Sequence, residues 1–247
     1  MSPTLAASTP AARSRAAARR GGGRDSTYTI DLVILTVVDG ELGVALTRAD
    51  AHPTAKAGVR PRERWSLPWE GGAPDEPLQA AAARVAADVL GDAPAWMEQV
   101  GAFGDGRRHP APAPLSVAYV VLIPAGAELD AESGAEFFGL SALPPLAPRQ
   151  RAMVDAAVAH VRSRVGQAPV AFRLLPPSFT LSELQERYEL LLGRQLHKAS
   201  FRRALQGARI VEPTDVWRSE GRGRPAQLFR YATRRKKVPP RGVRFDA

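Results

Sequence analysis

Apolar and polar positions alternate in long blocks through the first half of the chain. Apolar runs at residues 28–38 and 42–46, separated by an Asp-Gly turn, predict a β-hairpin. Another apolar run at residues 115–123 predicts a strand, and an alanine-rich stretch at residues 78–90 predicts a helix. Strands before and after a helix in this order predict a mixed α/β or α+β sandwich.

The second half repeats its apolar residues with the period of a helix. Residues 141–149, rich in proline, indicate a boundary, and a helix is expected from about residue 150 to residue 165. Thr180 and Glu183 form a capping box, so another helix is expected to start at Leu181. Its buried face is expected to hold three side chains at spacings of four and three: Leu184, Tyr188 and Leu191.

A shorter helix is expected over about residues 198–206, with Phe201 and Leu205 buried and Gly207 at its end. Its basic side chains then point away from the buried stripe. That arrangement is typical of the second helix of a helix-turn-helix, which enters a groove of DNA.

A basic loop over residues 218–226 joins two expected strands, at 210–212 and 227–231. A hairpin after a helix-turn-helix makes it winged, and guanidinium groups on a wing can reach phosphates or a narrow minor groove. The loop also contains RGRP, the core of an AT-hook, but its place between two strands favours a wing.

Charge is divided unevenly along the chain. The net charge of +9 combines five arginines without an acid in residues 1–24, an acidic body, and a strongly basic segment from residue 197 onward. A basic end beside an acidic body suggests contact with a polyanion. The first residues are expected to be a disordered arm. No apolar run is long enough to span a membrane, and the absence of cysteine excludes disulfides and thiolate metal sites.

Residues 67–91 keep the spacing of a phosphate-hydrolysing motif, the Nudix box Gx5Ex7REUxEExGU, in which U is a bulky apolar residue. Its acids share one face of a helix and hold divalent ions. Counted from Arg84, Glu76 is in frame. Val85 and Val89, however, stand where two glutamates belong. Because valine cannot ligate a hard cation, no metal site and no catalytic residue are expected.

Together these segments resemble the Nudix-related transcriptional regulator (NrtR) family over about residues 26–233. Three stretches carry the likeness: TIDLVILTVVDGELGVALTRA with the WSLP and PDE of the box; LSVAYVVLIP behind the loop GDGRRHP; and FTLSELQERYELLLGRQLHKASFRRAL with GRPAQLFRY. The last is the most specific, because a degenerate box fused to this pattern is typical of a regulator. Trp69 and Glu70 depart from the glycine pair of relatives, which puts the shape of the phosphate-side loop in question.

The resemblance implies an α+β chain, with an N-terminal Nudix-fold α/β/α sandwich and a C-terminal winged helix-turn-helix domain. Four segments are expected: a disordered basic arm over 1–25, a Nudix-like effector-sensing domain over 26–145, a winged helix DNA-binding domain over 146–235, and a basic tail over 236–247.

The family's members are implied to be homodimeric bacterial repressors that bind palindromic operators on double-stranded DNA. They are cytoplasmic, nucleoid-associated when bound to DNA, and many control NAD metabolism and release DNA when ADP-ribose or a related nucleotide binds. We therefore expect a repressor, of NAD metabolism genes, whose inactive Nudix domain senses such an effector and needs no cofactor. Two alternatives stay open: an active Nudix hydrolase of ADP-ribose-type substrates, and a DNA-binding regulator whose Nudix domain is a non-sensing scaffold.

Two sets of side chains are candidates for binding. Arginines in the GDGRRHP loop are favoured for the nucleotide because a diphosphate prefers guanidinium partners. Box residues could be relics, structural ion pairs or ligand contacts, and structural ion pairs are favoured. The ligand candidates are Arg62, Arg64, Glu76, Arg84, Arg107 and Arg108. The DNA candidates are Lys198, Ser200, Arg202, Arg203, Arg222 and Arg224.

Overall fold

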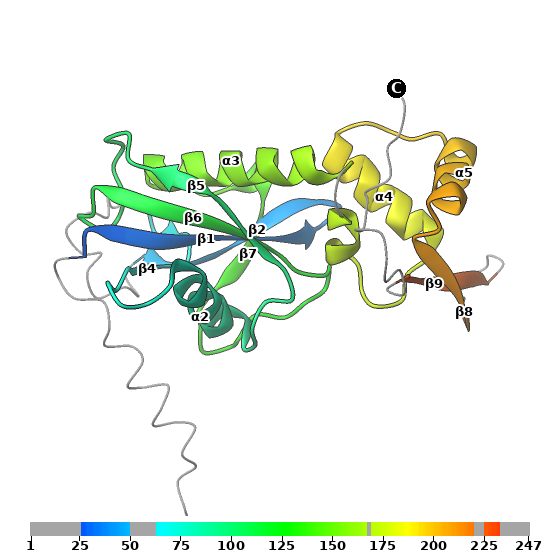
Figure 1. Ribbon diagram of the computed structural model, residues 1–247, viewed down its shortest axis with the longest axis horizontal. Coiled ribbons are helices and arrows are strands. Elements are labelled where there is room, and N and C mark those ends of the chain that lie inside the picture. Colours follow the sequence, from blue (N-terminus) through cyan, green and yellow to red (C-terminus); the bar gives the residue numbers. More distant parts are fainter. Residues whose placement is uncertain (1–25, 50–62, 167–168, 220–224, 233–247) are drawn as a thin grey trace, which may run out of the picture.

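A computed structural model describes residues 26–49, 63–166, 169–219 and 225–232 of the chain (Figure 1). The arm and tail expected at the two ends lie outside these residues. Within them, the first sheet comprises β1 (Tyr28–Val38), β2 (Glu41–Arg48), β3 (Trp65–Ser66), β4 (Trp69–Gly71), β5 (Met97–Phe103), β6 (Leu115–Leu122) and β7 (Glu136–Gly139).

Strand β1 is the centre of this sheet. It runs parallel to β6, with Tyr28 opposite Leu115 and Leu35 opposite Leu122, and antiparallel to β2 and β4. A strand paired on both sides and covered on both faces is buried throughout, which explains its nearly continuous apolar run. The strands and turn expected over residues 28–46 and 115–123 are confirmed within a residue or two.

Two helices cover opposite faces of the sheet (Figure 1). Helix α2 (Leu78–Leu90) has the bounds that the sequence predicts, and α3 (Pro148–Arg164) begins slightly earlier than expected. Val33 of β1 and Val161 of α3 lie in one buried cluster, whereas Leu32 of β1 and Val85 of α2 lie in another. Successive residues of a strand face opposite sides, so the α/β/α sandwich is confirmed.

Helix α3 forms the second helical layer of the sandwich. It packs on the sheet through its apolar side, and its first turn hydrogen-bonds to residues before β6. The boundary expected between residues 145 and 146 separates this helix from the layer that it covers. We therefore propose a boundary after α3, in the segment that leads to the 3-10 helix η4 (Val170–Leu174).

The C-terminal part is a helix-turn-helix followed by a hairpin. It comprises α4 (Leu181–Leu192), α5 (Lys198–Ala208), β8 (Val211–Arg218) and β9 (Ala226–Tyr231). The capping box is confirmed: the Glu183 amide donates to the Thr180 hydroxyl at 3.1 Å, and the Thr180 amide donates to the Glu183 carboxylate at 2.7 Å. The five side chains expected in its core are buried: Leu184, Tyr188, Leu191, Phe201 and Leu205.

Three local expectations need correction. Helix α5 does not end at Gly207 as expected but continues to Ala208. The next residue, Arg209, takes the left-handed conformation at φ 49° and ends the helix. Strand β8 is longer than the expected 210–212, because a bulge between Pro213 and Trp217 lets it pair with β9 again beyond the irregularity. Strands β5 and β7 were not predicted, since β5 is only half-buried and β7 has four residues.

The sandwich and the winged helix share one apolar core. Val165 at the end of α3, Leu174 of η4 and Tyr188 of α4 belong to the same buried cluster as Val33 of the sheet. The ring of Phe172 contacts that of Tyr188, with centroids 6.4 Å apart. In the described part of the chain, no helix has the length and apolar character needed to cross a membrane.

The shared core gives a matched pair of substitutions. Val161 is fully buried, whereas Val216 on β8 is 57% exposed. We expect Val161→Ala to lower the free energy of unfolding by about 2 kcal/mol, because it removes buried methyl groups and leaves a cavity. Val216→Ala should change it by less than about 0.5 kcal/mol. Urea unfolding, monitored by circular dichroism, measures the free energy of unfolding of both variants. Equal losses in the two variants would contradict the assignment of Val161 to the shared core.

Candidate functional site

An ion pair joins the two parts of the degenerate box. Arg84 of α2 donates to Glu76 at 2.8 and 3.1 Å and also contacts Glu70 of β4. The hydrogen bonds between these two side chains lower the pKa of Glu76 and raise the pKa of Arg84. The box residues therefore hold α2 to β4 and to the loop that connects β4 with α2.

Val85 and Val89 lie in the core beneath this ion pair. They are 6% and 4% exposed and belong to the cluster that joins α2 to Leu32 and Ile34 of β1. Asp88, the remaining acid of the helical segment, is exposed. Among the residues that the structure describes, no group of three His, Cys, Asp or Glu side chains is placed to hold a metal ion.

Trp69 and Glu70, which stand where relatives have glycines, face opposite sides of the sheet. Trp69 is paired with Asp31 and Glu70 with Ile30. Glu70 reaches Arg84 on the α2 side. Trp69 is buried on the other side, under the loop formed by residues 104–114, and its ring lies edge-on to His109 at 5.2 Å between centroids. The tryptophan therefore supports this loop, which we call loop 104–114.

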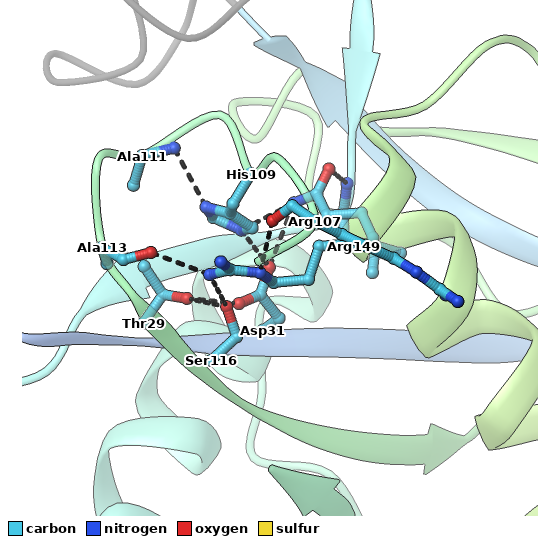
Figure 2. A network of polar contacts seen from close by, with 10 residues as sticks. Thr29, Asp31, Arg107, His109, Ala111, Ala113, Ser116 and Arg149 are labelled. Atoms are coloured by element: carbon cyan, nitrogen blue, oxygen red, sulfur yellow. Dashed lines mark hydrogen bonds and ion pairs between the residues drawn. The ribbon is translucent and has the colours of Figure 1, made fainter. Parts of the chain in front are cut away.

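A buried polar network lies at the base of loop 104–114 (Figure 2). The carboxylate of Asp31, on β1, is fully buried. One of its oxygens accepts from His109 Nε2 at 2.8 Å and from Gln150 Nε2 at 3.0 Å. The other accepts from the Thr29 hydroxyl at 2.7 Å. Burial raises the pKa of Asp31, but the hydrogen bonds from His109, Thr29 and Gln150 outweigh it, so the pKa lies below its ordinary value.

The contacts of His109 define its tautomer. The backbone amide of Ala111 donates to His109 Nδ1 at 2.9 Å, so this nitrogen carries no proton. The proton is then on Nε2, which donates it to Asp31. A neutral imidazole thus joins the loop to β1, and its protonation at Nδ1 would place two N–H groups against each other.

Arg149 in the first turn of α3 holds loop 104–114 from the other side. Its side chain is buried, and its guanidinium donates to the carbonyl of Arg107 at 3.0 Å and to that of Ala113 at 2.8 Å. Its backbone amide donates to the carbonyl of Arg108 at 3.1 Å. A buried arginine that binds two carbonyls six residues apart fixes the conformation of the loop segment between them.

The ligand candidates divide into two groups on opposite faces of β4. Arg84 and Glu76 lie on the α2 side and bind each other. On the other side, Arg107 is exposed and pairs with Asp105 of its own loop, whereas Arg108 is bound by Glu63. Arg64 is exposed just before β3. Arg62 lies outside the described residues.

The basic face expected on the second helix is present. Lys198, Ser200, Arg202 and Arg203 are exposed on α5, while Phe201 and Leu205 of the same helix are buried. All four candidate DNA contacts on this helix are therefore accessible to solvent. Arg222 and Arg224, expected on the wing, lie outside the described residues.

Two polar residues that the sequence did not single out fix the turn before α5. On α4, the side-chain amide nitrogen of Gln185 donates a hydrogen bond to the Glu189 carboxylate at 2.9 Å. The Glu189 carboxylate accepts from the Leu196 amide at 2.8 Å, and the Gln185 amide donates to the Leu196 carbonyl at 2.9 Å. Both backbone groups of Leu196 are thereby held, so the turn sets the angle at which α5 leaves α4.

The hairpin is tied to the start of α4. Arg218 on β8 lies 2.6 Å from Glu183, the capping-box acid. Burial raises the pKa of Glu183, but the Thr180 amide and Arg218 together bring it below its ordinary value. One carboxylate thus caps the helix and positions the strand that leads to the wing.

Similarity to known proteins covers both halves of the chain. Residues 171–231 match the NrtR DNA-binding winged helix domain. The chain is 32% identical over 213 residues to the ADPR responsive transcriptional repressor NtrR of Acinetobacter baylyi, covering 83% of this chain and 81% of that protein. It shares 26% identity and a TM-score of 0.70 with Shewanella oneidensis NrtR complexed with a 27mer DNA, over 83% of this chain and 94% of that one.

A further structure shows the same fold. The MutT/nudix family protein from Enterococcus faecalis is 17% identical to this chain, with a TM-score of 0.61 over 91% of this chain and 99% of that one. The expected fusion of a Nudix fold to a winged helix is therefore confirmed.

The buried carboxylate generates a pH prediction. Because the pKa of Asp31 is lower in the folded than in the unfolded chain, its stabilisation is present above about pH 4 and is lost as the pH falls through the lowered value. At pH 7, Asp31→Asn should reduce the free energy of unfolding by about 1–3 kcal/mol.

The difference between wild type and Asp31→Asn should narrow steadily below about pH 4. Denaturant unfolding at a series of pH values measures it. Asp155→Asn on α3 is the control, because Asp155 is an exposed member of an i, i+4 pair. If the difference in the free energy of unfolding between wild type and Asp31→Asn stays constant down to about pH 2, the ionised carboxylate does not contribute to stability.

Proposed function

The chain belongs to the NrtR family of Nudix-related transcriptional regulators, and we propose that it is a repressor whose DNA binding is controlled by ADP-ribose or a related nucleotide. The observation that carries the proposal is the chain's likeness, over most of its length, to an ADPR responsive transcriptional repressor. The exposed basic face of α5 and the arginine-bearing loop 104–114 supply a surface for each ligand.

Helix α5 binds the operator in this proposal. Lys198, Ser200, Arg202 and Arg203 face solvent on a helix whose position is fixed by Gln185 and Glu189. Contacts to phosphates supply affinity and those to base edges supply sequence preference. The wing, through Arg222 and Arg224, adds phosphate or minor-groove contacts. A homodimer presents two such helices to the half-sites of a palindromic operator.

Loop 104–114 receives the nucleotide in this proposal. Arg107 is the candidate best placed for a diphosphate, because its side chain is exposed and its backbone is held by Arg149. Arg108 is bound to Glu63, and Arg84 to Glu70 and Glu76, so we assign these residues to shaping the site. Arg64, which is exposed just before β3, and Arg62 are further candidates for contact with the nucleotide.

Nucleotide binding regulates without cleavage in this proposal. Val85 and Val89 are core residues, and Arg84 neutralises the acids that stay near them. To act as an effector, the nucleotide must bind the DNA-released geometry more tightly than the DNA-bound one. The protein then acts in the cytoplasm, at the nucleoid when bound to DNA, on genes of NAD metabolism, and no cofactor is required.

Operator binding tests the regulatory proposal. We expect the full chain to shift operator DNA from upstream of its own or neighbouring genes, and ADP-ribose to reverse the shift. Arg202→Ala combined with Arg203→Ala should weaken binding and make it less dependent on salt, with a slope shallower by about 0.9 for each phosphate that is no longer neutralised. Arg151→Ala on α3, which breaks only an exposed ion pair, should behave as wild type.

The absence of a shift at moderate salt would overturn the proposal. A shift that ADP-ribose leaves unchanged would favour a regulator with a non-sensing Nudix scaffold.

Catalysis is tested separately by incubating the chain with ADP-ribose and Mg²⁺. We expect no release of AMP above a protein-free blank, because two acids of the box are replaced by buried valines. Chromatography of the nucleotides measures it. Magnesium-dependent AMP release that disappears in Asp88→Ala would instead identify an active hydrolase.

A further inference from the structure

We propose that Arg149 is a positioning residue through which loop 104–114 is coupled to α3, and through α3 to α5. The inference rests on the proposed function, because it concerns how a nucleotide at this loop changes DNA binding. Its premise is geometric: one buried guanidinium, on the first turn of the helix that completes the sandwich, holds the loop at the carbonyls of Arg107 and Ala113.

The first link is between the loop and α3. Arg107, whose side chain is exposed, has its carbonyl bound by Arg149 Nε at 3.0 Å. Arg149 Nη1 binds the carbonyl of Ala113 at 2.8 Å, and the Arg149 amide binds the carbonyl of Arg108 at 3.1 Å. Figure 2 shows the guanidinium between the loop and β1. An anion that moves Arg107 therefore acts on the residue whose backbone Arg149 holds.

The second link is a hydrogen-bonded chain that connects Arg149 to Asp31. Arg149 Nη1 donates to the Ser116 hydroxyl at 3.4 Å, which lies 2.7 Å from the Thr29 hydroxyl. Because Thr29 donates to Asp31 at 2.7 Å, its oxygen accepts from Ser116. The buried cation and the buried carboxylate are thus joined by two hydroxyl groups. Removing charge or hydrogen bonds at one end leaves buried polar groups unsatisfied at the other.

Gln150 strengthens the attachment of the same helical turn. Its amide nitrogen donates to Asp31 at 3.0 Å, and its carbonyl oxygen accepts from the Leu67 amide at 3.3 Å. The start of α3 is therefore fixed to β1, to the segment before β4 and to loop 104–114. A rearrangement of the loop at these hydrogen bonds therefore also moves the helix.

The third link runs from the end of α3 to α5. A helix of 17 residues spans about 25 Å and moves as a unit. Val161 of α3 and Phe172 of η4 lie in one buried cluster. The ring of Phe172 contacts those of Tyr231 and Tyr188, with centroids 4.8 and 6.4 Å apart. Tyr188 in turn contacts Phe201 of α5 at 5.6 Å. A packed series of side chains thus joins Arg149's helix to the helix that carries the proposed DNA-binding side chains.

The test compares the Kd for operator DNA in the presence of saturating ADP-ribose with the Kd in its absence. The measured quantity is the first Kd divided by the second. For wild type we expect a ratio in the range of about 5–150. Arg149→Lys keeps the charge but loses the planar fork that binds two carbonyls, so the ratio should fall to about 1–2. Arg151→Lys, two residues along the same helix and paired with Asp155 on the surface, should keep the wild-type ratio.

Each outcome has a distinct meaning. A folded Arg149→Lys protein that keeps the wild-type ratio overturns this inference and leaves the proposed function intact. A wild-type ratio of 1 overturns the proposed function together with the inference. A reduction confined to Arg149→Lys supports coupling, since a merely structural role would lower the melting temperature without changing the ratio.

Hydrogen exchange on the wild-type protein tests the coupling of loop 104–114 to α5 even if Arg149→Lys does not fold. On addition of ADP-ribose, we expect exchange to change in loop 104–114, in the first turn of α3 and in α5. A change confined to loop 104–114 would overturn the inference.

Discussion

A charged carboxylate in the middle of a sheet has to be solvated by the protein, because water does not reach it and an unpaired buried charge is costly. In this chain the carboxylate is Asp31, in the central strand. Satisfying it recruits His109 from loop 104–114 and Gln150 from α3. The same carboxylate therefore fixes the loop that presents Arg107 and the first turn of the helix that leads toward the winged helix.

The box residues contribute packing and ion pairs to the fold. Val85 and Val89 fill the core between α2 and β1, and Arg84 pairs with Glu70 and Glu76. Trp69, on the opposite face of β4, supports loop 104–114. An ion pair on one face of β4 and an aromatic contact on the other thus hold α2 and loop 104–114 in place.

Local signals in the sequence predict much of the fold. The periodicity of residues 28–46 and 78–90, and the capping box at Thr180, predict elements that the structure confirms, because hairpins, helices and caps depend on neighbouring residues. The polar network was missed, because Asp31 and Gln150 are 119 residues apart. One signal was available: an acid inside an otherwise apolar strand requires a buried partner. Likewise, the side on which α3 packs depends on tertiary contacts that its sequence does not encode locally.

Coupling between a nucleotide site and a DNA site on one chain is reciprocal, so it can be measured from either ligand. Calorimetry would compare the Kd of ADP-ribose for the free protein with its Kd for the protein saturated with operator. If the two sites are coupled, operator weakens ADP-ribose binding by the same factor as ADP-ribose weakens operator binding. Equal ADP-ribose affinity in the presence and absence of operator would show that the sites are independent.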